Sequence, residues 1–218
     1  MKFLRRFLVF LFRLVIAFFA LTGTFATWTG QTPDNWFFFT HETNFLAGLI
    51  FLWAAFATLL DGVQPWAWLK SGITLYLIVV GVVANTILPA PNLALKPHYF
   101  GIPEPWIVHI IVPILVTVDW FLADRHRRLK WHYSLSWLIY FIVYFAVILT
   151  RAHIWPKAGL LTKTDPYPYG FIDLTQHTVM TVATNAVLCL AAFFILGLIM
   201  WAIDRLLPSH PLIDSDPR

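Results

Sequence analysis

Six long apolar stretches divide the chain, and shorter polar or charged segments separate them. The stretches cover residues 7–27, 36–60, 66–88, 105–123, 134–150 and 177–203. A helix needs roughly 20 predominantly apolar residues to cross the hydrocarbon core of a bilayer. Each stretch reaches or approaches that length. The pattern therefore predicts an all-α fold, a polytopic membrane helix bundle of about six transmembrane helices.

The segments between the stretches carry turn-forming and charged residues, as in GQTPDN, DGVQP and DRHRRLK. No internal repeat is evident, and no segment has the composition of a separate soluble domain. We therefore expect a single transmembrane helical domain over residues 1–207. Residues 208–218 form a short polar tail, which is too short to fold alone.

The first apolar stretch also fits a second interpretation. Basic residues precede it and small residues end it, as in a cleaved signal peptide. However, its apolar run is longer than the core of a usual signal, and Arg13 lies within it. A long arginine side chain at that position can extend to the lipid headgroups. We therefore expect a retained first helix with Arg13 reaching towards the membrane surface.

The composition supports a membrane location. Of the residues, 59% are apolar and only 12% are charged, whereas a soluble domain carries about a quarter charged residues. So few charges cannot cover a water-exposed surface, so lipid must cover much of it. The single cysteine, Cys189, excludes an internal disulfide, and we expect it to be a buried small apolar residue.

The basic residues are distributed unevenly between the two sides of the predicted bundle. With the N-terminus inside, eleven of the 15 Lys and Arg residues fall on the inner side. The remaining four are Lys96, Arg151, Lys157 and Lys163. Because cytoplasmic loops carry an excess of Lys and Arg, both termini should be cytoplasmic. This topology accounts for the net charge of +4, so no nucleic acid partner is expected. Asp119, near the inner end of the fourth stretch, should pair with the basic inner segment DRHRRLK.

Polar side chains inside the stretches gather towards the outer side. Thr40, Thr43 and Asn44 are spaced at i, i+3 and i+4, so they share one helical face. Thr40 and His109 each lie four residues inside a stretch, which places both about 6 Å deep at 1.5 Å per residue. Polar groups within spans tend to face the bundle interior or a cavity. The positions predict that the hydroxyl and the imidazole lie at one level.

Further polar residues approach that level from other segments and from the loop before the sixth stretch. The candidates for substrate binding or for oxyanion stabilisation are Asn44, Asn85, Tyr167, Tyr169, Asp173, His177, Thr181 and Asn185. A structural role stays open for each, because such groups commonly bond to their own backbone or to a neighbouring helix. Pro113 removes the partner of the His109 carbonyl, which fits a cavity and also fits ordinary packing.

Three sequence elements occur in the same order in one known family. They are FFFTHETNFL in the second stretch, WIVHIIVPILVTVDWFL in the fourth and DPYPYGFID before the sixth. From the second stretch to the sixth, the chain resembles the androgen-induced and androgen-dependent TFPI-regulating membrane proteins, in particular their bacterial branch. The resemblance implies six spans in a bacterial plasma membrane, and the topology predicted from the basic residues makes the site face outward. It also implies hydrolysis of fatty acid esters of hydroxy fatty acids, with Thr40 resembling the nucleophile and His109 its partner base.

The chemistry of these two residue types permits that reaction. A threonine hydroxyl becomes nucleophilic when an adjacent base takes its proton, and histidine is the usual base near neutral pH. The resulting hypothesis is a two-step acyl transfer without cofactor or metal, whose partner is a lipid or fatty-acyl ester in the membrane. No carboxylate that orients His109 is evident, and Asp173 is the best-placed candidate.

Two other functions stay open from the sequence. His41, His109, His153 and His177 all lie towards the outer side, and imidazole suits zinc, copper and haem iron. No HxxxH pair or CxxC motif is present in these spans, so a metal or haem site would depend entirely on tertiary packing. The same polar pocket could instead serve a non-enzymatic lipid-binding or transport protein. Inverted repeats and broken helices, which are typical of transporters, are not clearly present.

Overall fold

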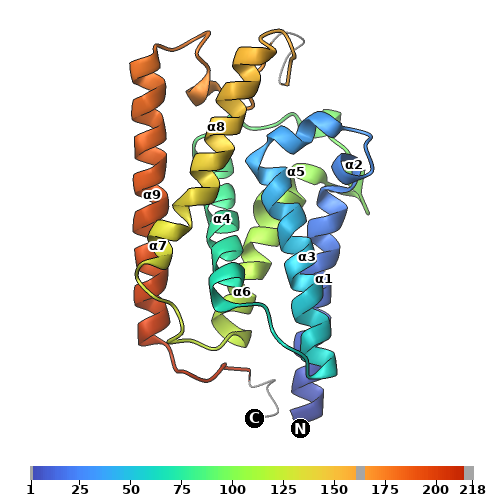
Figure 1. Ribbon diagram of the computed structural model, residues 1–218. Coiled ribbons are helices and arrows are strands. Elements are labelled where there is room, and N and C mark those ends of the chain that lie inside the picture. The colour runs from blue at the N-terminus through green and yellow to red at the C-terminus, as the bar shows by residue number, and fades with distance from the viewer. Residues whose placement is uncertain (1, 161–164, 214–218) are drawn as a thin grey trace.

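The computed structural model of the protein describes residues 2–160 and 165–213. The long helices are α1 (Lys2–Gly23), α3 (Phe39–Leu60), α4 (Ala67–Thr86), α6 (Val112–Ala123), α8 (Leu138–Ile154) and α9 (Val179–Leu206). They run along one common direction (Figure 1). The shorter elements are α2 (Phe25–Trp28), α5 (Glu104–Trp106), α7 (Tyr133–Ser136), η1 (Pro33–Phe37), η2 (Leu93–Leu95), η3 (Ile107–Ile111), η4 (Gly170–Ile172), and the paired strands β1 (His98–Tyr99) and β2 (Ile102–Pro103).

The part of the chain that the structure describes contains five helical segments long and apolar enough to cross a membrane. They are Phe39–Leu60, Ala67–Thr86, Glu104–Ala123, Tyr133–Ile154 and Val179–Leu206. The prediction of a polytopic helical membrane protein is thereby confirmed. The first predicted span also forms a helix, the 22-residue α1. It is not one of the five, so a sixth crossing stays a prediction.

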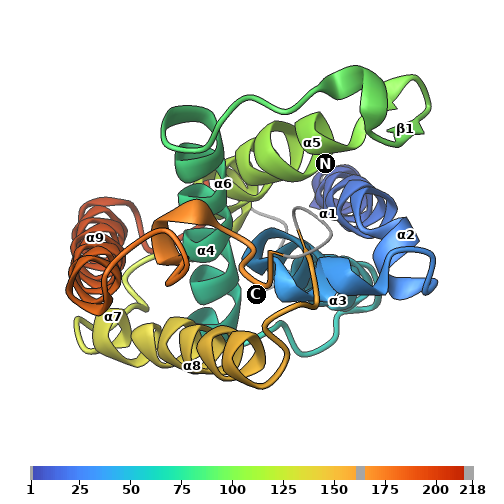
Figure 2. The same ribbon diagram turned by 90° about the horizontal axis from the view of Figure 1, so that it is seen from above.

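Helix α4 lies in the middle of the bundle. Seen from above (Figure 2), α1 and α3 lie on one side of α4 and α9 lies on the opposite side, while α8 runs along the lower edge of the view. Helix α1 packs along α3, and this close approach needs Gly48. A Cβ atom at that position would lie 2.6 Å from the Cγ atom of Leu21. The apolar core forms where these helices meet, around buried residues such as Phe51 and Leu77.

The two ends of the bundle differ in the segments that they carry. Helix α1 begins and α9 ends at the same end (Figure 1), together with the loops 61–66 and 124–132. We name this the basic end, because the second loop carries Arg125, Arg127, Arg128 and Lys130. The opposite end carries the β1–β2 strands and is named the hairpin end. Residues 214–218 of the predicted tail lie outside the described residues, as does Lys163. The cytoplasmic location of the basic end stays a prediction.

Two predictions about charged side chains were wrong. Arg13 does not extend to the membrane surface: it is 3% exposed, and its guanidinium donates to Asp119 at 3.0 Å and to Asp124 at 2.9 Å. Asp119 does not pair with the basic segment that follows it; its second partner is Lys70 of α4. A buried charge is costly unless it is paired, so packing inside the bundle brings opposite charges together there.

Candidate functional site

Thr40 lies in the first turn of α3, at the hairpin end of the bundle. The preceding turn η1 ends at Phe37, and an extended Phe38 leads into the helix. The Thr40 side chain is buried, and its Oγ1 atom lies 3.4 Å from Nε2 of His109. The structure thus brings together the hydroxyl and the imidazole that the sequence places at one level.

His109 lies in the middle of a π-helical turn, η3, between α5 and α6. Such turns occur often at functional sites. Pro113 has no N–H group to bond the His109 carbonyl, and the side-chain amide of Asn85 reaches that carbonyl at 3.3 Å instead. Helix α4 passes close to the His109 carbonyl: a Cβ atom at Gly81 would lie 3.2 Å from this oxygen. Helix α4 therefore supports the turn that carries the imidazole.

Asn44 links the two segments that carry the candidate pair. Its Nδ2 atom donates to the carbonyl of Thr40 at 2.8 Å and to the carbonyl of Val108 at 3.2 Å. Val108 immediately precedes His109 in the π-helical turn. The side-chain amides of Asn44 and Asn85 thus donate hydrogen bonds to backbone carbonyls around the site. Asn44 therefore fixes the position of Thr40 relative to the His109 turn, and Asn85 ties that turn to α4.

A cavity of about 240 Å³ extends from the Thr40 hydroxyl into the bundle. Helices α3, α4, α8 and α9 and the segment around η4 enclose it. Its lining is mainly aliphatic and aromatic: Phe39, Thr40, Val79, Val80, Val83, Ala84, Ile87, Leu88, Phe141, Tyr144, Phe145, Tyr169, Phe171, Ile172, Asn185, Leu188, Cys189 and Phe193. Asn185, one of the polar groups in it, donates to the Phe171 carbonyl at 2.7 Å. The cavity therefore suits an apolar chain whose end lies beside Thr40.

Two tyrosines surround the Thr40 end of this cavity. Tyr144 donates to the Phe37 carbonyl at 2.8 Å and accepts from the Phe39 N–H at 3.3 Å. The Tyr169 hydroxyl forms hydrogen bonds with the side chain and the backbone of Thr40 and with Tyr144. Burial raises the pKa of Tyr169 above its ordinary value, although these hydrogen bonds act in the opposite direction. Tyr169 therefore keeps its proton at neutral pH, and its hydroxyl lies beside Thr40.

A second hydroxyl–imidazole–carboxylate group lies at the same end. His41 Nδ1 is 2.8 Å from the Thr27 hydroxyl, and His41 Nε2 is 3.2 Å from the Glu104 carboxylate. All three side chains are buried, and together they link α2, α3 and α5. Glu104 also lies within electrostatic range of the His109 ring. The sequence did not predict Glu104 as a residue of the site, because nothing in its local sequence shows which histidines lie near it.

Asp173, the sequence candidate for orienting His109, has other partners. Its carboxylate accepts hydrogen bonds from the backbone and side chain of Thr175 at 2.7 and 2.6 Å, and from the Gln176 amide at 2.6 Å. Burial alone would raise the pKa of Asp173, but these hydrogen bonds hold it below its usual range. Among the described residues no hydrogen bond joins Asp173 to His109. Asp173 stabilises the turn that leads into α9.

Three other sequence candidates also lie apart from the pair. Tyr167 is buried in the loop before η4, where its N–H bonds to the Asp165 side chain. His177 and Thr181 are exposed, and the N–H of Thr181 bonds to the hydroxyl of the helix-capping Thr178. These polar residues lie in the loop before α9 and in its first turn, where polar side chains are exposed or bond to the local backbone. Of the eight lining candidates, Tyr169 and Asn185 line the Thr40 cavity.

The histidines that suggested a metal site are dispersed. His153 and His177 are exposed, and His41 is engaged with Thr27 and Glu104. Within residues 2–160 and 165–213, no group of three or more His, Cys, Asp or Glu side chains is arranged to hold a metal ion.

The site therefore consists of a buried threonine that lines an apolar cavity, an imidazole within reach of its hydroxyl, and two tyrosines beside the threonine. Neutral groups dominate it, and the His41 imidazole and the Glu104 carboxylate lie beside it, 3.2 Å apart. Its geometry carries the functional interpretation, since comparison of the chain with models of known protein families, with curated protein sequences and with solved structures found no match.

Proposed function

We propose that the protein is a membrane-embedded threonine hydrolase that cleaves lipid acyl esters at the hairpin end of the bundle. The observation that carries this proposal is the 3.4 Å approach of Thr40 Oγ1 to His109 Nε2, at the end of an apolar cavity. Hydrogen bonds of this kind are usually shorter. In free enzymes, however, catalytic pairs are often longer than they are once substrate is bound.

The two residues support a two-step acyl transfer. In the first step, His109 Nε2 accepts the hydroxyl proton as Thr40 Oγ1 attacks the ester carbonyl carbon. The bond from that carbon to the alcohol oxygen then breaks, and the alcohol leaves with the proton from His109. In the second step, water attacks the acyl carbon and gives a proton to His109. The bond to Thr40 Oγ1 breaks, the hydroxyl regains its proton, and the fatty acid is released.

Tyr169 is suited to stabilise the oxyanion of both steps. The Tyr169 hydroxyl keeps its proton at neutral pH and lies beside Thr40, so it can donate to a negative charge that develops there. Donors aimed at a developing negative charge are commonly the largest electrostatic contribution to acyl transfer. Asn44 and Asn85 then support the site by holding the backbone.

The apolar cavity supports a long acyl chain as the bound part of the substrate. Ile87 and Leu188 line the cavity, yet they are 66% and 62% exposed at the side of the bundle. Exposed apolar side chains of a membrane helix face lipid. An acyl chain can therefore pass from the bilayer into the cavity between α4 and α9, while water reaches Thr40 from the hairpin end.

Labelling with a fluorophosphonate probe tests the nucleophile. In this reaction the Thr40 oxygen bonds to phosphorus, fluoride leaves, and His109 takes the proton. Wild type should be labelled, whereas Thr40→Ala and His109→Ala should not. Thr43→Ala is the matched control, because Thr43 is a buried hydroxyl one turn away that donates to the Phe39 carbonyl at 2.7 Å. Equal labelling of wild type and Thr40→Ala would remove the assignment.

A lipid-binding role is the second candidate, because the cavity is apolar whether or not a reaction occurs beside it. It is distinguished by the lipids that copurify with the full-length protein and by their fate. Retained acyl lipid without hydrolysis of an ester panel, in a folded protein that the probe does not label, would favour binding. Conversion of a copurified ester to fatty acid by wild type, and not by Thr40→Ala, would favour the hydrolase.

A further inference from the structure

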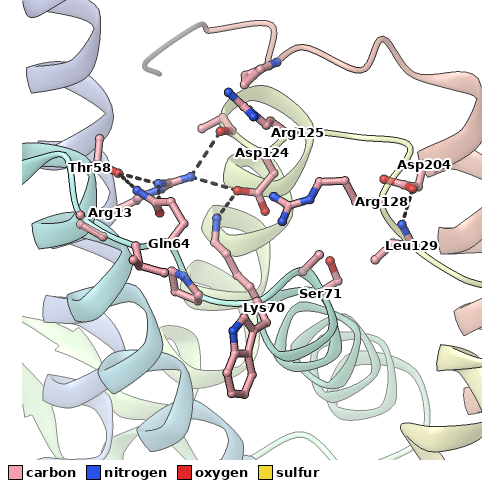
Figure 3. Close-up of a pocket in the computed structure, with 18 of the residues that line it drawn as sticks. Arg13, Thr58, Gln64, Lys70, Ser71, Asp124, Arg125, Arg128, Leu129 and Asp204 are labelled. Carbon is pink, nitrogen blue, oxygen red and sulfur yellow. Dashed lines mark hydrogen bonds and ion pairs between the residues drawn. The ribbon is translucent and has the colours of Figure 1, made fainter. Parts of the chain in front are cut away.

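A second pocket of about 360 Å³ lies at the basic end, far along the bundle from Thr40. Figure 3 shows its lining, which comes from the ends of α3, α4, α6 and α9, from α1 and from the loops between them. Its charged lining residues are Arg13, Asp61, Lys70, Asp124, Arg125, Arg128 and Asp204. The proposed ester hydrolysis uses none of these residues. The proposed hydrolysis therefore does not account for this pocket.

Two buried cations form the floor of this pocket. Arg13 and Lys70 are 3% and 4% exposed, and both bond to Asp119 and Asp124. Arg13 also donates to the Thr58 hydroxyl at 2.6 Å. These contacts hold the two positive charges in fixed positions beneath the open part of the pocket.

The acidic side chains of the lining already have partners. Asp124 binds the two floor cations. Asp61 is paired with Arg6 at 3.6 Å. Asp204 accepts from the Leu129 N–H at 2.9 Å and lies 3.3 Å from His126 Nδ1. Little uncompensated negative charge is therefore left to attract a cation.

Arg128 differs from the charged residues described above, because its side chain has no partner among the described residues. Its side chain is exposed and extends from the loop 124–132 into the pocket towards Asp124 (Figure 3). It makes no hydrogen bond or ion pair with any residue in the part of the chain that the structure describes. The hydroxyl-bearing Ser71, which is buried, lines the pocket as well. An arginine side chain that donates to no other described residue therefore lies in a pocket whose other charged floor residues, Arg13, Lys70 and Asp124, are already paired.

We propose that this pocket binds a phosphate group, with the Arg128 guanidinium donating two hydrogen bonds to it. The planar fork of arginine matches two phosphate oxygens. The pocket volume falls in the range of about 300–1,000 Å³ that is typical of small-molecule sites. Its place at the ends of membrane-crossing helices gives two sources of the same chemistry, a phospholipid headgroup and a soluble phosphate ester.

The test measures thermal unfolding of the full-length protein in two arms. The first arm adds inorganic phosphate to protein in neutral detergent, against chloride at equal ionic strength. The second compares nanodiscs of phosphatidylcholine with nanodiscs that also contain phosphatidylglycerol. Arg128→Gln removes the fork, and Arg128→Lys keeps the charge without it. Lys130→Gln is the matched control, because Lys130 is exposed in the same loop and does not line the pocket.

Wild type and Lys130→Gln should be stabilised in at least one arm. Arg128→Gln should need about tenfold more phosphate or anionic lipid for the same shift, since one charged hydrogen-bonding partner is worth about one power of ten or more in affinity. Arg128→Lys should fall between them. Stabilisation in the detergent arm alone identifies a soluble phosphate, and stabilisation in the nanodisc arm alone identifies a headgroup. No stabilisation in either arm overturns the proposal, as does an equal response of Arg128→Gln and wild type or an equal loss in Lys130→Gln.

Discussion

The two ends of the bundle bury polar groups in different ways. At the hairpin end, the groups around Thr40 are mostly neutral: a hydroxyl, an imidazole, two phenols and two amides. At the basic end, Arg13, Lys70, Asp119 and Asp124 form a network of full charges. A neutral group can be buried with one hydrogen bond and still accept another partner, whereas a buried charge must be fully compensated. Chemistry is therefore expected at the first end, and charge-based recognition together with stability at the second.

The largest expected effect is a contrast between two substitutions: one at the hairpin end should abolish activity, and one at the basic end should lower stability. Thr40→Ala should lower ester hydrolysis by at least about 10³-fold, because a nucleophile has no substitute, and should leave thermal unfolding nearly unchanged. Asp119→Asn should do the reverse, because it leaves Arg13 and Lys70 short of a buried counter-charge, at a cost of about 3–5 kcal/mol. Hydrolysis of a short-chain ester and thermal unfolding in detergent measure both.

Asp34→Asn is the matched control for Asp119→Asn, since Asp34 is an exposed carboxylate at the other end. It should unfold like wild type. An Asp119→Asn protein as stable as Asp34→Asn would show that the charge network does not hold the basic end together.

The next effect tests the phenols beside Thr40. Tyr169→Phe removes one proposed oxyanion donor and should lower kcat for ester hydrolysis about 10²-fold, while KM changes little. Tyr167→Phe is the matched control, because Tyr167 lies two residues away in the same loop and does not line the Thr40 cavity. Equal rates for the two variants would assign Tyr169 a packing role only.

The smallest expected effect concerns the turn before α9. Because the pKa of Asp173 is held below its usual value, its stabilising contribution is fully present above about pH 4, the ordinary range of the group. It is lost as the pH falls through the lowered value. Asp173→Asn should therefore unfold more easily than wild type at pH 7, by about 1 kcal/mol. The difference should shrink at acidic pH. A difference that does not depend on pH would mean that the ionised carboxylate is not the stabilising form.

Much of this architecture could be predicted from local properties of the chain. Hydropathy gave the apolar stretches that become α3, α4, α6, α8 and α9, because lipid selects for long apolar helices with few charges. The rise of a helix is constant, so counting from the stretch ends placed Thr40 and His109 at one depth. The missing N–H of Pro113 correctly indicated a freed carbonyl at His109, which Asn85 now bonds.

The choice of partners required the folded chain. Arg13 and Asp119 are 106 residues apart, and nothing local distinguishes a buried arginine from one that reaches the membrane surface. The same holds for Glu104, which lies beside His41 only because α5 packs near α3, and for Tyr144, whose ring resembles any interfacial aromatic in sequence. Hydropathy and helical rise are properties of single segments. Pairing energies depend on distance and desolvation, and these exist only once the helices have packed.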